Sequence, residues 1–186
     1  MTAFGLTEVA DWLAETGRAV QQQPTGLSVA DDEVTMRIAQ DDHEWVIHKT
    51  WRDEDRGVVF TSPSVEDVDR YLTLLTANEV RSRKGLPPLR HGITTRPDGI
   101  AEPSNGLNLS GDLDRGFVLT DPRTGEERRF ASDIEAARFS RYIGLAPGVL
   151  RSAILSSARV IDVPAARPPD PEHPTGSPSD SSTPDR

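Results

Sequence analysis

Residues 33–61 decide the fold, and they divide into five short segments: EVTMRIA (33–39), QDDH (40–43), EWVIHKTW (44–51), RDEDR (52–56) and GVVFT (57–61). In the first and third segments apolar and polar side chains alternate, as they do in strands that bury one face. The second and fourth segments are polar and fit turns. Because such short connections join neighbouring antiparallel strands, the stretch predicts an antiparallel meander.

The alternation also predicts which side chains share a face of each strand. One face of the first strand carries Val34, Met36 and Ile38, and one face of the second carries Trp45, Ile47 and Trp51. The opposite face of the second strand carries Val46 and His48. A sheet with one apolar face needs helices to cover that face.

A helix is predicted directly after the meander. Pro63 suits the first helical position because it has no amide hydrogen to leave unpaired. Acidic residues favour the first turns of a helix and an apolar stripe faces the core, and both are present here: Glu66, Asp67 and Asp69, then Val65, Val68, Tyr71, Leu72, Leu74 and Leu75. We expect the helix to end near residues 81–84, where basic side chains precede Gly85.

Further elements complete the predicted architecture. A first helix is capped by Thr7 and stops at Gly17, a third begins with a capping box of Ser132 and Glu135, and a last short helix begins at Pro147. Additional strands are predicted at residues 27–30, 107–109, 117–120 and 128–131, the last two forming a hairpin. This order of elements indicates an α+β fold, with antiparallel strands packed against three to four helices in a single domain.

The predicted domain covers residues 1–162. Residues 163–186 contain seven prolines, four serines, two threonines and one glycine, and no apolar side chain larger than valine. Such a segment cannot bury enough apolar surface to offset the entropy lost on ordering. We therefore expect residues 163–186 to form a disordered tail.

Composition argues against several classes of function. The chain has 186 residues and a formal net charge of −9, whereas proteins that bind nucleic acid present a basic surface to the phosphates. It contains no cysteine, which excludes disulfides, thiolate metal sites and cysteine nucleophiles. No apolar run reaches the roughly 20 residues that span a bilayer, and the N-terminus lacks the features of a signal peptide. We expect a soluble, cytoplasmic protein whose partner is neither nucleic acid nor membrane.

No motif of a catalytic or cofactor site stands out in the sequence. A G-x-S-x-G motif and a glycine-rich phosphate loop are both missing. Residues 41–44 (DDHE) and 53–57 (DEDRG) have the composition of metal-binding turns, but in the second Gly57 comes one position too early for a calcium loop. We interpret both as solvated turns and expect no metal, no cofactor and no enzymatic activity.

Two surface segments are candidate binding sites for a protein partner. Acidic turns occur at residues 31–33, 41–44 and 53–55, and the first and third should share one end of the meander; from the third we select Asp53, Glu54 and Asp55. The second candidate is the loop at residues 91–105, which we expect to protrude into a partner's cleft, with contacts from Arg96, Asp98, Glu102 and Asn105. Ordinary polar turns and a mobile surface loop are the alternative interpretations.

Several short runs, within residues 5–157, resemble a known family. They are FTS (60–62), DRYL (69–72) and Arg81 with GLP (85–87), together with Trp12, Gly17, Phe139, Ser140 and Tyr142. This set is similar to the immunity protein 61 family of bacterial toxin systems, which includes the antitoxin of the tuberculosis necrotizing toxin, a NAD-hydrolysing enzyme. The resemblance implies an antitoxin that binds the catalytic domain of a cognate toxin, a NAD glycohydrolase, and blocks its active site.

Two other functions remain open from the sequence. A cytosolic chaperone or adaptor for a secreted protein would also be acidic and non-enzymatic, but it would bind a different partner and would form dimers. A small hydrolase or transferase would instead need a buried carboxylate or histidine with a strongly shifted pKa in a cleft.

Overall fold

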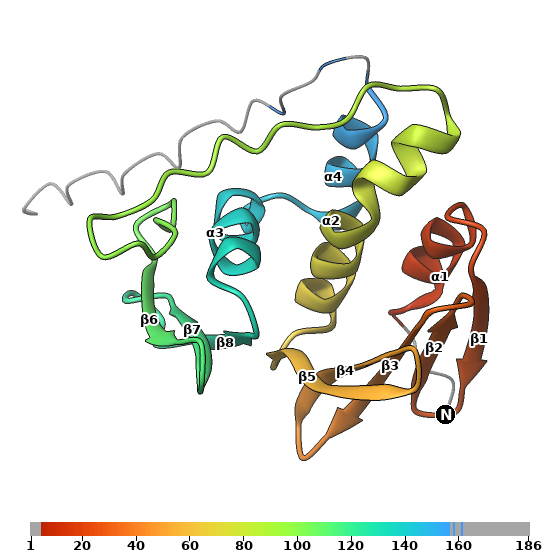
Figure 1. Cartoon of the computed structure of the whole chain (residues 1–186), viewed down its shortest axis with the longest axis horizontal. Coiled ribbons are helices and arrows are strands. Elements are labelled where there is room, and N and C mark those ends of the chain that lie inside the picture. The colour runs from red at the N-terminus through yellow and green to blue at the C-terminus, as the bar shows by residue number, and fades with distance from the viewer. Residues whose placement is uncertain (1–4, 157, 159–160, 162–186) are drawn as a thin grey trace, which may run out of the picture.

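The computed structural model describes residues 5–156, 158 and 161, and this part of the chain contains four helices and eight strands (Figure 1). The helices are α1 (Thr7–Ala14), α2 (Val65–Arg83), α3 (Asp133–Tyr142) and α4 (Pro147–Ile154). The strands are β1 (Ala19–Gln23), β2 (Gly26–Ala30), β3 (Val34–Asp41), β4 (Glu44–Trp51), β5 (Glu54–Ser62), β6 (Asn108–Asp112), β7 (Gly116–Thr120) and β8 (Glu127–Phe130). The predicted tail at residues 163–186 lies outside the described residues, and the domain boundary at residue 162 stays a prediction.

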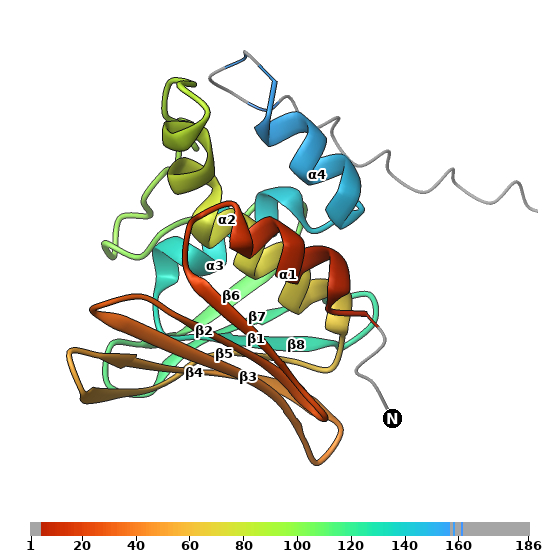
Figure 2. The same ribbon diagram turned by 90° about the vertical axis from the view of Figure 1, so that its right-hand side faces the viewer.

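The strands form a single antiparallel sheet in the order β1-β2-β3-β4-β5-β8-β7-β6. All four helices lie on one face of this sheet, above it in Figure 2. The predicted meander is present as β2 to β5, and β8 pairs with β5 through Phe60↔Phe130 and Thr61↔Arg129. The arrangement confirms the α+β fold with antiparallel pairing.

The strands differ from the prediction in one addition and in their lengths. The unpredicted β1, with the sequence AVQQQ, pairs with β2 along its whole length although most of its side chains are exposed. Its main-chain bonds, rather than burial of apolar side chains, place it in the sheet. β4 has the predicted bounds, whereas β3 and β5 are longer than predicted because the turns contain only two residues each, Asp42-His43 and Arg52-Asp53, all with positive φ.

Two helices begin at different residues from those predicted. Thr7 is the first residue of α1 rather than its cap, and Leu6 occupies the N-cap position. α2 begins at Val65 with Ser64 as its N-cap, two residues after the predicted start at Pro63. The predicted end of α2 is confirmed, since the helix stops at Arg83.

The predicted capping box of α3 is wrong. Ser132 occupies the N-cap position, but its hydroxyl makes no capping bond. The carboxylate of Glu135 is engaged elsewhere, because it accepts a 2.8 Å hydrogen bond from the Tyr71 hydroxyl on α2. The side chain that could have capped its own helix therefore links α3 to α2.

Aromatic rings join the two halves of the sheet to the helices. Phe60 on β5 stacks on Tyr71 of α2 with ring centroids 4.4 Å apart. Phe130 on β8 meets Phe60 at 5.0 Å and Phe139 of α3 at 5.4 Å. Phe60, Phe130 and Phe139 are almost completely buried, so the centre of the core lies where β5 meets β8.

Arg81, near the end of α2, is completely buried and donates only to carbonyl oxygens. Its Nε donates to the carbonyl oxygen of Pro87 at 2.6 Å. Its two terminal nitrogens donate to the carbonyl oxygens of Ile154, Ser156 and Ala158, which lie at and beyond the end of α4. A cation at this position satisfies the unpaired carbonyls of a helix C-terminus and compensates the helix dipole. Arg81 therefore fixes the end of α4 against α2.

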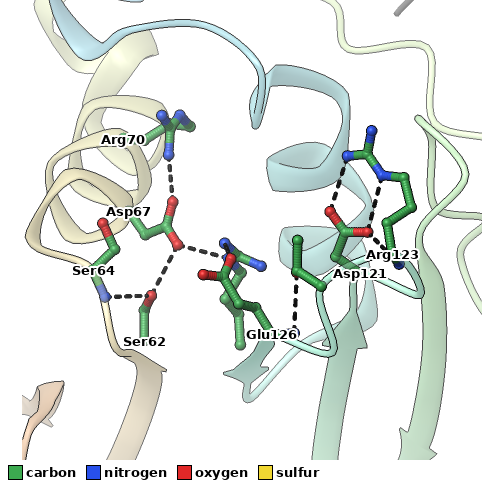
Figure 3. A network of polar contacts seen from close by, with 9 residues as sticks. Ser62, Ser64, Asp67, Arg70, Asp121, Arg123 and Glu126 are labelled. Carbon is green, nitrogen blue, oxygen red and sulfur yellow. Dashed lines mark hydrogen bonds and ion pairs between the residues drawn. The ribbon is translucent and has the colours of Figure 1, made fainter. Parts of the chain in front are cut away.

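A buried carboxylate, Asp67, connects four parts of the fold (Figure 3). Its side chain is 5% exposed, accepts hydrogen bonds from Ser62 Oγ at 2.9 Å and Arg128 Nε at 2.6 Å, and pairs with Arg70. The Arg70 Nε in turn donates to the carbonyl oxygen of Leu145 at 3.0 Å, in the link between α3 and α4. α2, β5, β8 and the α3–α4 link therefore converge on a single side chain.

Replacing Asp67 by asparagine should lower the free energy of unfolding by about 3–5 kcal/mol, because the buried guanidinium of Arg70 would lose its counter-charge and that of Arg128 would keep only the exposed Glu126. Urea unfolding of the two proteins measures this difference. Asp121→Asn is the matched control: Asp121 is also buried, but its ion-pair partner Arg123 is 73% exposed, so its loss should cost no more than about 1 kcal/mol. Equal losses for the two variants would contradict the central role of Asp67.

Candidate interaction surfaces

The acidic turns at residues 31–33 and 53–55 lie next to each other, as predicted from the meander. Arg52 connects them: its amide donates to the carbonyl oxygen of Glu33 at 2.6 Å, and its guanidinium forms a 2.6 Å ion pair with the Glu33 carboxylate. The turn at residues 41–44 lies at the other end of β3 and β4. The predicted clustering of the first and third turns is therefore confirmed.

Three carboxylates of this end form ion pairs with arginines: Glu33 with Arg52, Glu54 with Arg56 at 2.7 Å, and Asp31 with Arg18 at 2.8 Å. The carboxylate of Asp55 lies 3.1 Å from Nε2 of His48. Among the described residues Asp53 takes part in no ion pair. The end of the sheet is thus a mixed array of charges rather than the uniformly acidic surface that composition suggested.

Trp51 shares a face of β4 with Trp45 and Ile47, as predicted, but it is not buried in the core. It lies at the end of β4 on the helix face of the sheet, and it is 39% exposed because no helix covers this end of the strand. The guanidinium groups of Arg52 and Arg56 lie 5.1 Å and 4.9 Å from its ring, within cation–π range. Trp51 therefore presents a large apolar surface beside the candidate residues Asp53, Glu54 and Asp55.

The loop at residues 91–105 lies along α3 and does not protrude as predicted. The amide of Ala101 donates to Asp133 at the start of α3, and the amide of Ser104 donates to the hydroxyl of Ser140 near its end, both at 2.8 Å. Asn105 donates to the carbonyl oxygens of Ser140 at 2.8 Å and Arg141 at 3.3 Å. The loop is polar because it supplies hydrogen bonds to both ends of a helix.

The tip of the loop, around residues 96–99, is mostly exposed, and so are Thr94, Thr95, Glu102 and Asn105. Arg96 and Asp98 form a 3.1 Å ion pair across this tip, and the Ile100 amide donates to Asp98, which lowers the pKa of that carboxyl. Glu102 is exposed and accepts a hydrogen bond from Thr94 at 3.1 Å. No described hydrogen bond or ion pair joins this loop to Asp53, Glu54 or Asp55, which lie at the turn between the central strands β4 and β5.

A groove that the sequence did not predict lies between the sheet and the two central helices. It has a volume of about 370 Å³. Its lining comes from β4, β5, α2 and α3: Lys49, Trp51, Arg56, Val59, Tyr71, Leu75, Ala131, Ser132 and Glu135. A small hollow continues along α3 to Arg138. In the sequence, the only indication of this groove was the alternation in residues 44–51, which places Lys49 and Trp51 on the same face of the strand.

A second cavity, of about 350 Å³, opens where β5 meets the β6–β7 hairpin. Val58 and Leu113, which are 49% and 86% exposed, line it together with Arg115 and Arg129. Among the described residues no three histidine, aspartate or glutamate side chains gather as a metal site would require. Within the same residues no helix has the length and apolar character needed to cross a membrane.

His91, at the start of the loop, lies in a buried cationic environment. Its ring meets Tyr142 edge-on with centroids 5.9 Å apart, and its Nδ1 lies 3.3 Å from the Tyr142 hydroxyl. Burial, together with the positive charges of Arg138 and Arg141, lowers the pKa of His91 to about 4. The folded protein therefore keeps this imidazole neutral at neutral pH.

Asn105 should contribute to stability through its backbone as well as its side chain, because its φ of +60° is unfavourable for most residues. We expect Asn105→Ala to lower the free energy of unfolding by about 1–2 kcal/mol, since it removes the cap and keeps a strained backbone. Asn105→Gly removes only the cap and should cost less. Chemical unfolding of both variants tests this, and a larger loss for glycine than for alanine would disprove it.

The low pKa of His91 predicts acid sensitivity. In the unfolded chain the imidazole binds a proton below about pH 6.5, whereas in the folded chain it does so only below about pH 4. Its contribution is therefore complete above pH 6.5 and decreases as the pH falls towards 4. In His91→Gln the fall in unfolding free energy between pH 7.5 and pH 4.5 should be smaller than in the parent chain. The substitution also removes the packing of the ring on Tyr142, but this effect is the same at both pH values and cancels in the difference.

Comparison with known proteins gives the chain a family. A sequence model of the family described as Immunity protein 61 matches residues 12–158. Among solved structures, Rv3902c from M. tuberculosis has the same fold, with a TM-score of 0.67 and 22% sequence identity over 84% of this chain and 93% of that chain. No curated protein matches the sequence. The family match spans the described fold from Trp12 in α1 to the end of α4, and the chain therefore belongs to the immunity protein 61 family.

Proposed function

We propose that this protein is an antitoxin that binds the catalytic domain of a cognate toxin, a NAD glycohydrolase, and blocks its active site. The observation that carries the proposal is the family match over residues 12–158, which includes the whole sheet from β1 to β8 and the helices α2 to α4. The immunity protein acts without catalysis or cofactor, in the cytoplasm of the cell that produces the toxin.

Charge supports such a pairing. An enzyme that cleaves NAD must hold a pyrophosphate, for which cationic side chains are the usual ligands. A partner with a net charge of −9 is attracted to such a surface and is oriented by it during encounter. The proposed contacts are the exposed acidic residues Asp53, Glu54 and Asp55 and, in the loop at residues 91–105, Arg96 and Asp98 at the tip and Glu102 beside it. Asn105 is proposed to act there by holding the loop on α3.

The test is co-expression with the toxin-like domain encoded beside this gene, followed by NAD consumption measured with the immunity protein at increasing molar ratio. We expect co-purification of the two proteins and complete inhibition at one equivalent. Full NAD hydrolysis without a complex would reject this pairing and would favour the chaperone or adaptor function. A complex that leaves NAD hydrolysis intact would reject active-site blockage.

The proposed contacts are tested in the same assay by alanine substitution. Changing Asp98 and Glu102 together should weaken binding by about tenfold or more, equivalent to about 1.4 kcal/mol. Changing Asp41 and Asp42 together removes the same charge at the turn between β3 and β4, which is not among the proposed contacts, and this double variant serves as the control. Equal affinity of both double variants would show that the loop tip does not contact the toxin.

A further inference from the structure

The groove between the sheet and the two central helices carries positive charge in an otherwise acidic protein. Lys49 projects from β4, Arg56 from β5, and Arg138 continues the groove along α3. Among the described residues Lys49 and Arg138 take part in no ion pair, and Arg56 pairs only with Glu54, which is 71% exposed. The groove lies between β4, β5, α2 and α3, and Figure 1 shows the two helices standing over the middle of the sheet.

The one carboxylate inside the groove is already engaged. Glu135 accepts the hydrogen bond from the Tyr71 hydroxyl at 2.8 Å, and burial together with Glu135 raises the pKa of Tyr71, so this hydroxyl stays protonated. Arg138 lies one turn further along α3, and its Nε is buried without a hydrogen-bond partner among the described residues. Arg138 as a whole is only half-buried and takes part in no ion pair among the described residues, so the exposed part of its side chain is open to an acceptor from a partner.

Apolar surface lies between the two cations without charge partners. Tyr71 and Leu75, with the carboxylate of Glu135 beside them, line both the groove at Lys49 and the hollow at Arg138, so they separate the two cations. Trp51 forms the exposed rim beside Lys49. A phosphate site needs cations that converge on one point, whereas this arrangement spaces them along an apolar floor. Exposed tryptophan beside unpaired cations is typical of the dominant contacts in protein interfaces.

We propose that this groove receives a segment of the toxin's catalytic domain that carries a carboxylate beside an apolar side chain. The apolar side chain packs on Trp51 and Leu75, and the carboxylate binds Lys49 or Arg138. The inference rests on the proposed function, and it adds a cationic contact next to the acidic residues 53–55 on the same β4–β5 hairpin. The partner surface then needs both signs of charge in a fixed order, which provides specificity as well as attraction.

The composition of the chain offers a direct test, because Lys49 and Lys84 are its only lysines. Lys84 pairs with Glu15 at the end of α2, away from the groove, and provides an internal control. The complex with the toxin domain encoded beside this gene is treated with an acetylating reagent, and mass spectrometry compares both lysines with those of the free protein. We expect Lys49 to be protected at least about fivefold on binding and Lys84 to react equally in both samples.

Substitutions then test whether the contact contributes to affinity. Lys49→Met combined with Arg138→Met should weaken binding of the toxin domain at least about tenfold and reduce its dependence on salt, whereas Lys84→Met should leave affinity within about twofold. Trp51→Ala should weaken binding to a similar degree. Val149→Ala is its control, because Val149 is an exposed apolar residue on α4, outside the groove, and its loss should leave affinity unchanged. Thermal unfolding of each variant confirms that it is folded.

The outcomes separate the two proposals. Protection of Lys49 together with reduced affinity in the groove variants supports the inference. An inhibitory complex in which Lys49 is unprotected, or in which the groove variants bind as tightly as the parent chain, overturns the groove and leaves the antitoxin function standing. Failure of the toxin domain to bind at all rejects the proposed function for this pair, and with it the inference.

Discussion

The carboxylate of Asp67 is the contact on which the arrangement of helices over the sheet depends. Two arginines from different elements bind it, and one of them, Arg70, extends the connection to the link between α3 and α4. Taking a carboxylate and two guanidiniums out of water is costly, and the cost is offset only if all partners are in place together. The network therefore contributes less to total stability than to specifying a single position of α2 relative to β5 and β8.

Arg81 is a second buried ion that fixes α2, at the other end of the helix from Asp67. It is buried among carbonyl oxygens instead of carboxylates, and it connects the end of α2 with the end of α4. Four partial negative charges take the place of one full charge, and the helix dipole of α4 adds to them. Since Asp67 lies in the first turn of α2 and Arg81 in its last, both ends of the longest helix are fixed by buried ions. The middle of α2, between these two ions, carries Tyr71 and Leu75, which line the groove.

Periodicity was sufficient to predict β3, β4, α2 and the hairpin of β7 and β8, because each buries one face. It failed for β1, whose glutamines carry no apolar pattern and which depends on main-chain bonds to β2. It also failed for Glu135 and Trp51, since a local pattern does not show whether a side chain has a partner in another element. The same limit applies to the candidate surfaces: the acidic turns were found, but Glu33 and Asp31 are paired by arginines distant in sequence, Arg52 in the β4–β5 turn and Arg18 before β1.

Charge pairing decides which of these surfaces a partner can use. Ions that already have a partner within the chain, such as Glu33 with Arg52, gain little from a second one, because exposed pairs contribute only about 0–1 kcal/mol. A cation without an ion-pair partner among the described residues, such as Lys49 or Arg138, gains more from an incoming carboxylate. In the proposed complex, the formal charge of −9 speeds the approach of a basic partner, whereas the unpaired cations of the groove bind its carboxylate. Long-range attraction and short-range binding in that complex then depend on charges of opposite sign in the same protein.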